Sequence, residues 1–122
     1  MSTFRERLGQ SESGGNYGAR NSEGFSGKYQ FGPDRLSDFM SSTGKKFSMS
    51  QFQTNPALQE EVQAWHEDDI LTFVADQGLD KFIGQQVGGV VLSPESMLAM
   101  AHLGGKSGMK KFIETDGEYN PS

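Results

Sequence analysis

Apolar residues recur at roughly helical spacing along much of this chain, and glycine-rich stretches separate the segments in which they do so. The longest such segment begins at Asn55 and Pro56, a helix start signal, and ends at Gly78. Its apolar positions suit one side of a helix: Leu58, Val62, Trp65, Ile70, Phe73 and Val74. We predict that this segment is the longest helix and carries much of the core.

Local start signals predict two shorter helices before it. Thr3 followed by Glu6 resembles a capping box, which predicts a first helix from residue 4 to about residue 10 or 13. Pro33 suits the first turn of a second helix, which we expect to end near Ser42.

The remaining third of the chain shows similar signals. Ser93 caps and Pro94 begins a helix that ends at a pair of glycines, and a final helix follows at about residues 108–115. A short turn of helix at 79–83 and a glycine-rich connector at 84–92 precede them. Together these elements predict a mainly α fold of about five to six helices.

The stretch from residue 13 to residue 32 shows little helical periodicity. Six glycines in it, at positions 14, 15, 18, 24, 27 and 32, indicate a loop or a small irregular hairpin. The whole chain has 16 glycines among 122 residues, about 13%, against roughly 7% in average proteins. Glu12 lies at the point where the first predicted helix runs into this glycine-rich loop.

Composition is typical of a soluble globular protein, and we expect one domain over residues 1–122. With 34% hydrophobic and 22% charged residues and a net charge of −5, the chain lacks the clustered Lys and Arg that general nucleic-acid binding requires. No segment approaches the ~20 apolar residues of a membrane helix, so we expect no membrane insertion. Zero cysteines and two histidines make metal chemistry a poor hypothesis, and we expect no metal and no other cofactor.

Three short motifs add a specific resemblance. Residues 12 and 13 read "ES", residues 27–30 read "GKYQ", and residues 101–105 read "AHLGG". The glutamine of the second motif follows the glutamate of the first by eighteen positions. In this order and spacing the chain resembles the lysozyme-like lytic transglycosylases and goose-type lysozymes, whose pattern is ES, a loop, G-x-x-Q and later A-Y-N-A-G. The resemblance covers about residues 10 to 119.

A closer group within this family consists of phage and bacterial proteins that read ESGGNY, N-x-x-G-Y-x-G-K-Y-Q-F-G and A-A-H-L-G-G-x-G-G-x-K-K-F. The corresponding stretches here are Glu12 to Tyr17, Asn21 to Gly32 and Met100 to Phe112. The resemblance implies a small lysozyme-like fold in which the glycine-rich loop, or a small β-hairpin, covers an active-site cleft. Glycines in that loop would leave room for a polysaccharide against the backbone.

The activity that the resemblance implies is cleavage of the β-1,4 bond between N-acetylmuramic acid and N-acetylglucosamine in peptidoglycan. Protonated Glu12 would give its proton to the glycosidic oxygen, and its carboxylate would then take one from the sugar's own hydroxyl to leave a 1,6-anhydro product. Partial burial raises the pKa of a glutamate toward the range that this chemistry needs, and a helix end under a bulky loop offers such burial. Tyr29 and Gln30 would contact sugar, and Ser13 would orient the substrate or the glutamate.

Aromatic residues divide into two groups. Tyr17, Phe25 and Tyr29 lie in the glycine-rich loop and are candidates for stacking on sugar rings. Trp65 and the phenylalanines at positions 73, 82 and 112 share helical spacing with aliphatic residues, so we predict that they belong to the core.

Departures from the family pattern leave alternatives open. The tyrosine of A-Y-N falls on His102 and its asparagine on Leu103, so His102 either points into the cleft or lies on a helix surface. Glu23 is either an exposed loop glutamate or a second carboxylate, which would make the protein a lysozyme-type hydrolase that activates water. The run from His66 to Asp69 resembles a metal cluster, but consecutive helical residues do not face one site, so we interpret it as a solvated helix face.

Two classes of function follow. Glu12, Ser13 and Gln30 together favour an enzyme that acts on peptidoglycan glycan strands, whereas the changes at His102 and Leu103 leave room for a catalytically inactive structural or wall-binding virion module. The amino terminus lacks the apolar core of a signal peptide. We therefore expect synthesis in the cytoplasm and delivery to the periplasm and cell wall by phage tail or ejection proteins or by a lysis system. We also expect this chain to be the amino-terminal part of a longer virion protein.

Overall fold

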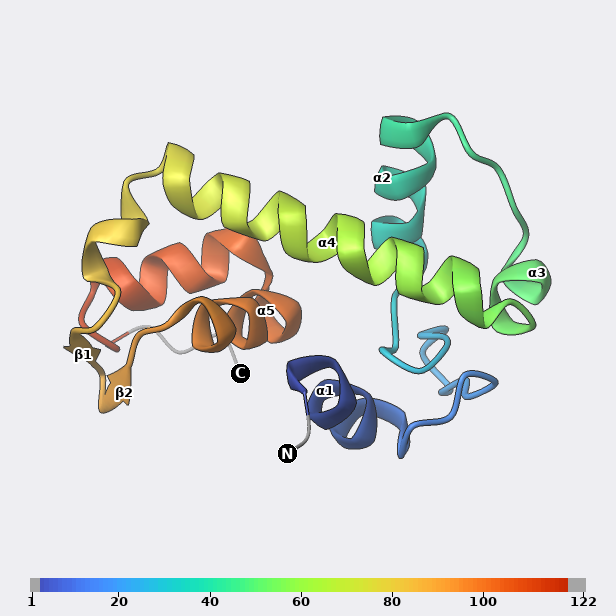
Figure 1. Ribbon diagram of the computed structural model, residues 1–122, viewed down its shortest axis with the longest axis horizontal. Coiled ribbons are helices and arrows are strands. Elements are labelled where there is room, and N and C mark those ends of the chain that lie inside the picture. Colours follow the sequence, from blue (N-terminus) through green and yellow to red (C-terminus); the bar gives the residue numbers. More distant parts are fainter. Residues whose placement is uncertain (1–2, 119–122) are drawn as a thin grey trace. The chain divides into compact units, whose positions relative to one another are not determined.

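The computed structural model describes residues 3–118 and shows a mainly helical protein (Figure 1). Its described elements are five α-helices, one short 3-10 helix and a two-stranded sheet. The chain divides into two compact units, Met1–Trp65 and His66–Ser122, and helix α4 (Pro56–Asp76) runs through both. Within residues 3–118, no helix combines the length and the apolar character needed to cross a membrane. The prediction of a mainly α fold is confirmed, and the single domain and the lysozyme-like architecture stay predictions.

Helix α1, Phe4–Ser13, begins and ends as its local signals predict. The Thr3 hydroxyl oxygen accepts a hydrogen bond from the Glu6 N–H at 3.1 Å. Gly14 ends the helix in a left-handed conformation, with φ 68°, which a residue without a side chain adopts at little cost. Glu12 therefore lies in the last turn of α1.

Helices α2 and α4 also begin at the predicted prolines. α2 spans Pro33–Thr43 and ends at Gly44, which has φ 77°. The Asn55 side-chain oxygen accepts a hydrogen bond from the Leu58 N–H at 3.1 Å at the start of α4. Side-chain caps thus fix the starts of α1 and α4, and a proline at the first position fixes the start of α2.

Between α2 and α4 lies a helix that the sequence pattern did not predict. α3 spans only Met49–Gln53. Its start is a reciprocal capping box between Ser48 and Gln51, with hydrogen bonds of 2.8 and 3.1 Å. Five residues are too few to show a helical period, and the signal that would have found α3 is this Ser-x-x-Gln spacing.

The core of the first unit combines the helices with the glycine-rich loop. Two of its buried aromatic residues, Tyr29 and Phe31, come from the loop itself, and the rings of Phe31 and Phe52 meet edge to face with centroids 6.4 Å apart. The buried cluster consists of Tyr29, Phe31, Leu36, Phe39, Phe52 and Val62, and Leu8, Phe47, Met49, Leu58 and Trp65 pack against it. The loop is therefore anchored by its own buried side chains.

The second unit contains a small hairpin where a connector was predicted. The 3-10 helix η1, Leu79–Phe82, occupies the predicted helical turn, and strands β1 (Gln86–Val87) and β2 (Val90–Val91) then pair antiparallel. Gly88 and Gly89 form the turn with φ 56° and 82°. A two-residue hairpin turn with positive φ at both positions favours Gly-Gly, so this sequence signal was available and was missed.

Helix α5, Pro94–Glu114, consists of two helical segments (Figure 1). Ser93 caps its start by accepting a hydrogen bond from the Ser96 N–H at 3.0 Å. Gly105 interrupts it with φ 78° and ψ 164°. This interruption agrees with the prediction of one helix that ends at a pair of glycines and a further helix after it.

Candidate active site

Glu12 lies on the side of α1 that faces the rest of the first unit. Leu8, one turn earlier, packs against the core of that unit, and the Nη1 atom of Arg5 lies 3.5 Å from Oε1 of Glu60 on α4. Residues one or two turns apart share a side of a helix, so Glu12 shares the side of Leu8 and Arg5. Its half-buried side chain agrees with this position.

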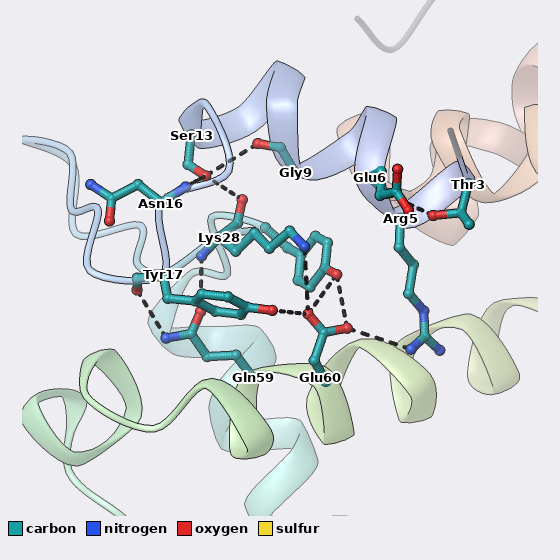
Figure 2. Close-up of polar contacts among 11 residues, drawn as sticks. Thr3, Arg5, Glu6, Gly9, Ser13, Asn16, Tyr17, Lys28, Gln59 and Glu60 are labelled. Atoms are coloured by element: carbon teal, nitrogen blue, oxygen red, sulfur yellow. Dashed lines mark hydrogen bonds and ion pairs between the residues drawn. The ribbon is translucent and has the colours of Figure 1, made fainter. Parts of the chain in front are cut away.

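Ser13 fixes the end of α1 to the glycine-rich loop (Figure 2). Its Oγ lies 2.7 Å from the carbonyl oxygen of Lys28 and 3.1 Å from that of Gly9, and it accepts a hydrogen bond from the Asn16 N–H at 3.0 Å. The hydroxyl is therefore engaged within the protein and holds the residue next to Glu12 in place. A contact between Ser13 and substrate stays a prediction.

The GKYQ motif forms the turn of a small irregular hairpin. Ser26 and Phe31 pair on either side of it through two backbone hydrogen bonds of 3.0 Å. The backbone N–H and the side-chain amide of Gln30 both donate to the Gly27 carbonyl oxygen, at 3.2 and 2.9 Å. The side chain of Gln30 thus helps to close the turn in which it lies.

Gln30 adopts a strained backbone conformation. Its φ is 57°, and within residues 3–118 Asp116 is the one other residue besides glycine with positive φ. For a residue with a Cβ atom this left-handed region costs roughly 1–2 kcal/mol. Such strain persists where the surrounding structure imposes it, and it is concentrated at functional sites. The strained position here is the glutamine of the GKYQ motif.

Gln59 on α4 anchors the glycine-rich loop through a buried amide. Its side chain is 0% exposed; Oε1 accepts from the Lys28 N–H, and Nε2 donates to the carbonyl oxygens of Tyr17 and Phe52, each at 2.9 Å. The amide therefore uses both its donor and its acceptor groups, as a buried amide must. Gly27 has φ 87°, and a Cβ atom there would lie 2.5 Å from Gln59 Oε1. The close approach of loop and helix requires glycine at this position.

Glu60, the next residue on α4, is surrounded by donors (Figure 2). The hydroxyls of Tyr29 and Tyr17 donate to its Oε2 at 2.7 and 2.9 Å, and Lys28 Nζ lies 3.8 Å from the same oxygen. Arg5 approaches Oε1, as described above. The hydrogen bond to Glu60 and burial raise the pKa of Tyr17, and burial followed by the same hydrogen bonding raises the pKa of Tyr29. Both phenols therefore remain donors at ordinary pH.

Tyr29 requires a correction to the predicted set of sugar contacts. Its side chain is 1% exposed and its ring meets Phe31 at a centroid distance of 6.4 Å. Because stacking on sugar needs an open ring face, we assign Tyr29 to the core. Tyr17 is half-buried, with Lys28 Nζ 5.2 Å from its ring centroid, and Phe25 is 38% exposed. Phe25 is therefore the most accessible of the three loop aromatics.

Glu23 lies in an exposed turn of the loop. The Asn21 side-chain oxygen accepts hydrogen bonds from the N–H groups of Glu23 and Phe25, at 2.9 and 3.0 Å. The Glu23 side chain is exposed. This environment favours the interpretation as an exposed loop glutamate over a second catalytic carboxylate.

His102 belongs to the second unit and pairs there with His66. Nε2 of His66 and Nδ1 of His102 lie 3.2 Å apart. His66 is only 7% exposed, and Lys106 Nζ donates to Asp69 Oδ2 at 2.8 Å. The interpretation of residues 66–69 as a solvated helix face is therefore wrong at His66, which is buried, whereas Asp69 is partly exposed. A contact of His102 with substrate stays a prediction.

Sequence reasoning missed Gln59 and Glu60 because it followed apolar residues alone. The buried positions of α4 include three polar residues and are spaced three or four apart over most of the helix: Gln59, Val62, Gln63, His66, Ile70 and Val74. This set has a more regular helical period than the apolar residues by themselves. Glutamine and histidine residues at the same helical spacing as the buried apolar residues were the sequence signal for buried polar contacts on α4.

Comparisons of the chain with protein-family models, with curated proteins and with solved structures found no match.

Proposed function

We propose that this protein cleaves the glycan strands of peptidoglycan as a lytic transglycosylase, with Glu12 as general acid and then general base. The observation that carries the proposal is the hydrogen bond of 2.7 Å between Ser13 Oγ and the Lys28 carbonyl oxygen. It joins the residue beside Glu12 to the turn that contains Gln30. Two motifs that are distant in sequence thereby support a single site.

The proposed reaction needs one carboxyl group that gives a proton and then takes one. Neutral Glu12 protonates the oxygen between N-acetylmuramic acid and N-acetylglucosamine, and the bond from that oxygen to the anomeric carbon of N-acetylmuramic acid breaks. The carboxylate then takes the proton of the C6 hydroxyl of the same sugar, whose oxygen bonds to the anomeric carbon. Glu12 thus gives one proton and regains one, and the product is a 1,6-anhydro sugar.

The surroundings of Glu12 support this role. Glu12 is a half-buried residue in the last turn of α1, next to Ser13, which is hydrogen-bonded to the loop. Gln30, in its strained conformation, is the loop residue that we propose to contact sugar. Tyr29 has no such role in the proposal, since it is buried.

The test is digestion of purified peptidoglycan by the wild type and by Glu12→Gln, with mass spectrometry of the released fragments. We expect anhydro-muropeptides from the wild type and a loss of about 10²–10⁴-fold in the variant, which keeps the shape of the side chain but cannot give the proton. Glu23→Gln is the matched control, because Glu23 is an exposed carboxylate in the same unit. It should keep full activity.

Two results would contradict the proposal. Fragments with reducing ends, lost in Glu23→Gln as well as in Glu12→Gln, would show a hydrolase that activates water. Folded wild-type protein that releases nothing but sediments with peptidoglycan would show a wall-binding module.

A further inference from the structure

Three parts of the first unit converge on the carboxylate of Glu60 (Figure 2). α1 supplies Arg5, the glycine-rich loop supplies Tyr17, Lys28 and Tyr29, and α4 supplies Glu60 itself. The contacts differ in strength. The two phenol hydrogen bonds, at 2.9 and 2.7 Å, are charge-assisted and short, whereas the ion pairs at 3.5 and 3.8 Å join partly exposed side chains and are weak individually.

The geometry of this cluster suits a side chain that only accepts hydrogen bonds at position 60. All four neighbours of the carboxylate, Arg5, Tyr17, Lys28 and Tyr29, present hydrogen-bond donors to it. A carboxylate accepts at every lone pair, while an amide of the same shape would turn two N–H donors toward this group of donors. Glutamine at position 60 would therefore fill the space and still lose part of the network.

Lys28 connects this cluster to Glu12. Its ammonium group approaches Glu60 at 3.8 Å, its N–H donates to Gln59 at 2.9 Å, and its carbonyl oxygen lies 2.7 Å from Ser13 Oγ. Its side-chain stem also lies against α1, since a Cβ atom at Gly9 would come within 2.6 Å of Lys28 Cε. A shift of Lys28 would therefore be passed directly to the end of α1.

We propose that Glu60 is a positioning residue of the site: through Lys28 and the two tyrosines, it holds the turn that carries Gln30 against the helix end that carries Glu12. This inference rests on the proposed function, because positioning has meaning only if Glu12 is catalytic. Glu60 acts through other residues and touches no reacting atom.

The test compares Glu60→Gln with Glu61→Gln. Glu61 is the next residue on α4, and its carboxylate pairs with Lys45 at the surface, so the control removes the same charge without touching the cluster. The first measurement is a phenolate absorbance titration of each variant. Glu60 helps to raise the pKa of Tyr17 and of Tyr29, so Glu60→Gln should lower both pKa values, while Glu61→Gln and Glu12→Gln leave them as in the wild type.

The second measurement is turnover on soluble, uncrosslinked glycan strands. We expect turnover by Glu60→Gln to fall about 100-fold, the scale of a misplacement near 1 Å, while its half-saturating glycan concentration changes less than threefold. Glu61→Gln should stay within about twofold of the wild type. If Glu60→Gln does not fold, Tyr17→Phe replaces it, because it removes one donor of the cluster and keeps the ring.

The outcomes separate the two proposals. Changed tyrosine titration with unchanged turnover would overturn the positioning role and leave the proposed function standing. Unchanged titration in Glu60→Gln would also overturn it, because the cluster would then not exist in solution. A wild type with raised tyrosine pKa values that releases no glycan fragments would contradict the proposed function itself and with it the positioning role.

Discussion

At the scale of single residues, the first unit concentrates backbone strain in the GKYQ turn. Gly27 and Gln30, its first and last residues, both have positive φ, 87° and 57°. Glycine adopts such a value at little cost, whereas the same conformation costs glutamine roughly 1–2 kcal/mol. The side chain of Gln30 is therefore the part of this turn that needs a functional explanation.

Replacement of Gln30 by glycine tests whether the Gln30 side chain serves activity or only the stability of the turn. Relief of the left-handed strain, about 1–2 kcal/mol, opposes the loss of one hydrogen bond, about 1 kcal/mol, and the greater chain entropy of glycine, about 0.5–1 kcal/mol. We expect the free energy of unfolding in urea to stay within about 1 kcal/mol of the wild type, while release of glycan fragments falls at least tenfold.

Asp116→Gly is the matched control for this prediction. Asp116 also has positive φ, 52°, and belongs to the second unit. It should keep both stability and activity. Full activity of Gln30→Gly would show that the strained glutamine serves only to close the turn.

At the scale of elements, the glycine-rich loop is ordered by the polar side of α4. Gln59 holds the backbone of the loop, and the neighbouring Glu60 holds its side chains. Gln53 adds a third anchor from the end of α3, with Nε2 donating to the buried Ser26 hydroxyl at 2.8 Å. A loop with many glycines loses much chain entropy on folding, and these buried hydrogen bonds offset that cost.

Two alanine substitutions test how closely loop and helix approach each other. Gly27→Ala places a Cβ atom 2.5 Å from Gln59 Oε1 at a φ of 87°, whereas Gly14→Ala, at φ 68°, meets nothing within 4 Å. We expect Gly27→Ala to lower the free energy of unfolding by about 2–4 kcal/mol, from strain and overpacking together, and Gly14→Ala by about 1–2 kcal/mol from strain alone. Urea unfolding of both variants measures the difference, and equal losses would show that Gln59 moves aside freely.

At the scale of the whole molecule, the tyrosines of the Glu60 cluster link stability to alkaline pH. The pKa values of Tyr17 and Tyr29 are raised above 10.0 in the folded protein. The unfolded chain therefore releases these protons first as the pH rises. The stabilising contribution is fully present below about pH 10 and is lost as the pH rises toward the folded pKa values.

Unfolding of a single variant at alkaline pH tests whether this stabilising contribution is lost as the pH rises. For each tyrosine with a raised pKa, the free energy of unfolding falls by up to about 1.4 kcal/mol per pH unit above pH 10. The free energy of unfolding should thus fall less steeply between about pH 9 and pH 11 in Tyr29→Phe than in the wild type. The two proteins differ only in the hydroxyl of Tyr29, so the difference between the profiles reports this group, and parallel pH profiles would contradict the cluster.

Local sequence signals were sufficient to predict where most helices begin and end. Three helices begin at signals that act within one turn of the chain, namely Thr3, Pro33 and Ser93. Local patterns are therefore sufficient to predict these helix starts. The position of Glu12 in the last turn of α1 follows from the same local chemistry. The hairpin turn at Gly88 and Gly89 is also encoded locally, because two adjacent glycines favour a turn with positive φ at both positions.

The residues that surround the candidate site became visible only in the folded structure. Tyr29 and Glu60 are 31 positions apart, and Ser13 and Lys28 are 15 apart, so neither contact leaves a local pattern in the sequence. The burial of Tyr29, the polar buried side of α4 and the His66–His102 pair depend on how distant segments pack. Packing fixes such partners through shape and satisfied hydrogen bonds, and these exist only once the segments are together in the folded chain.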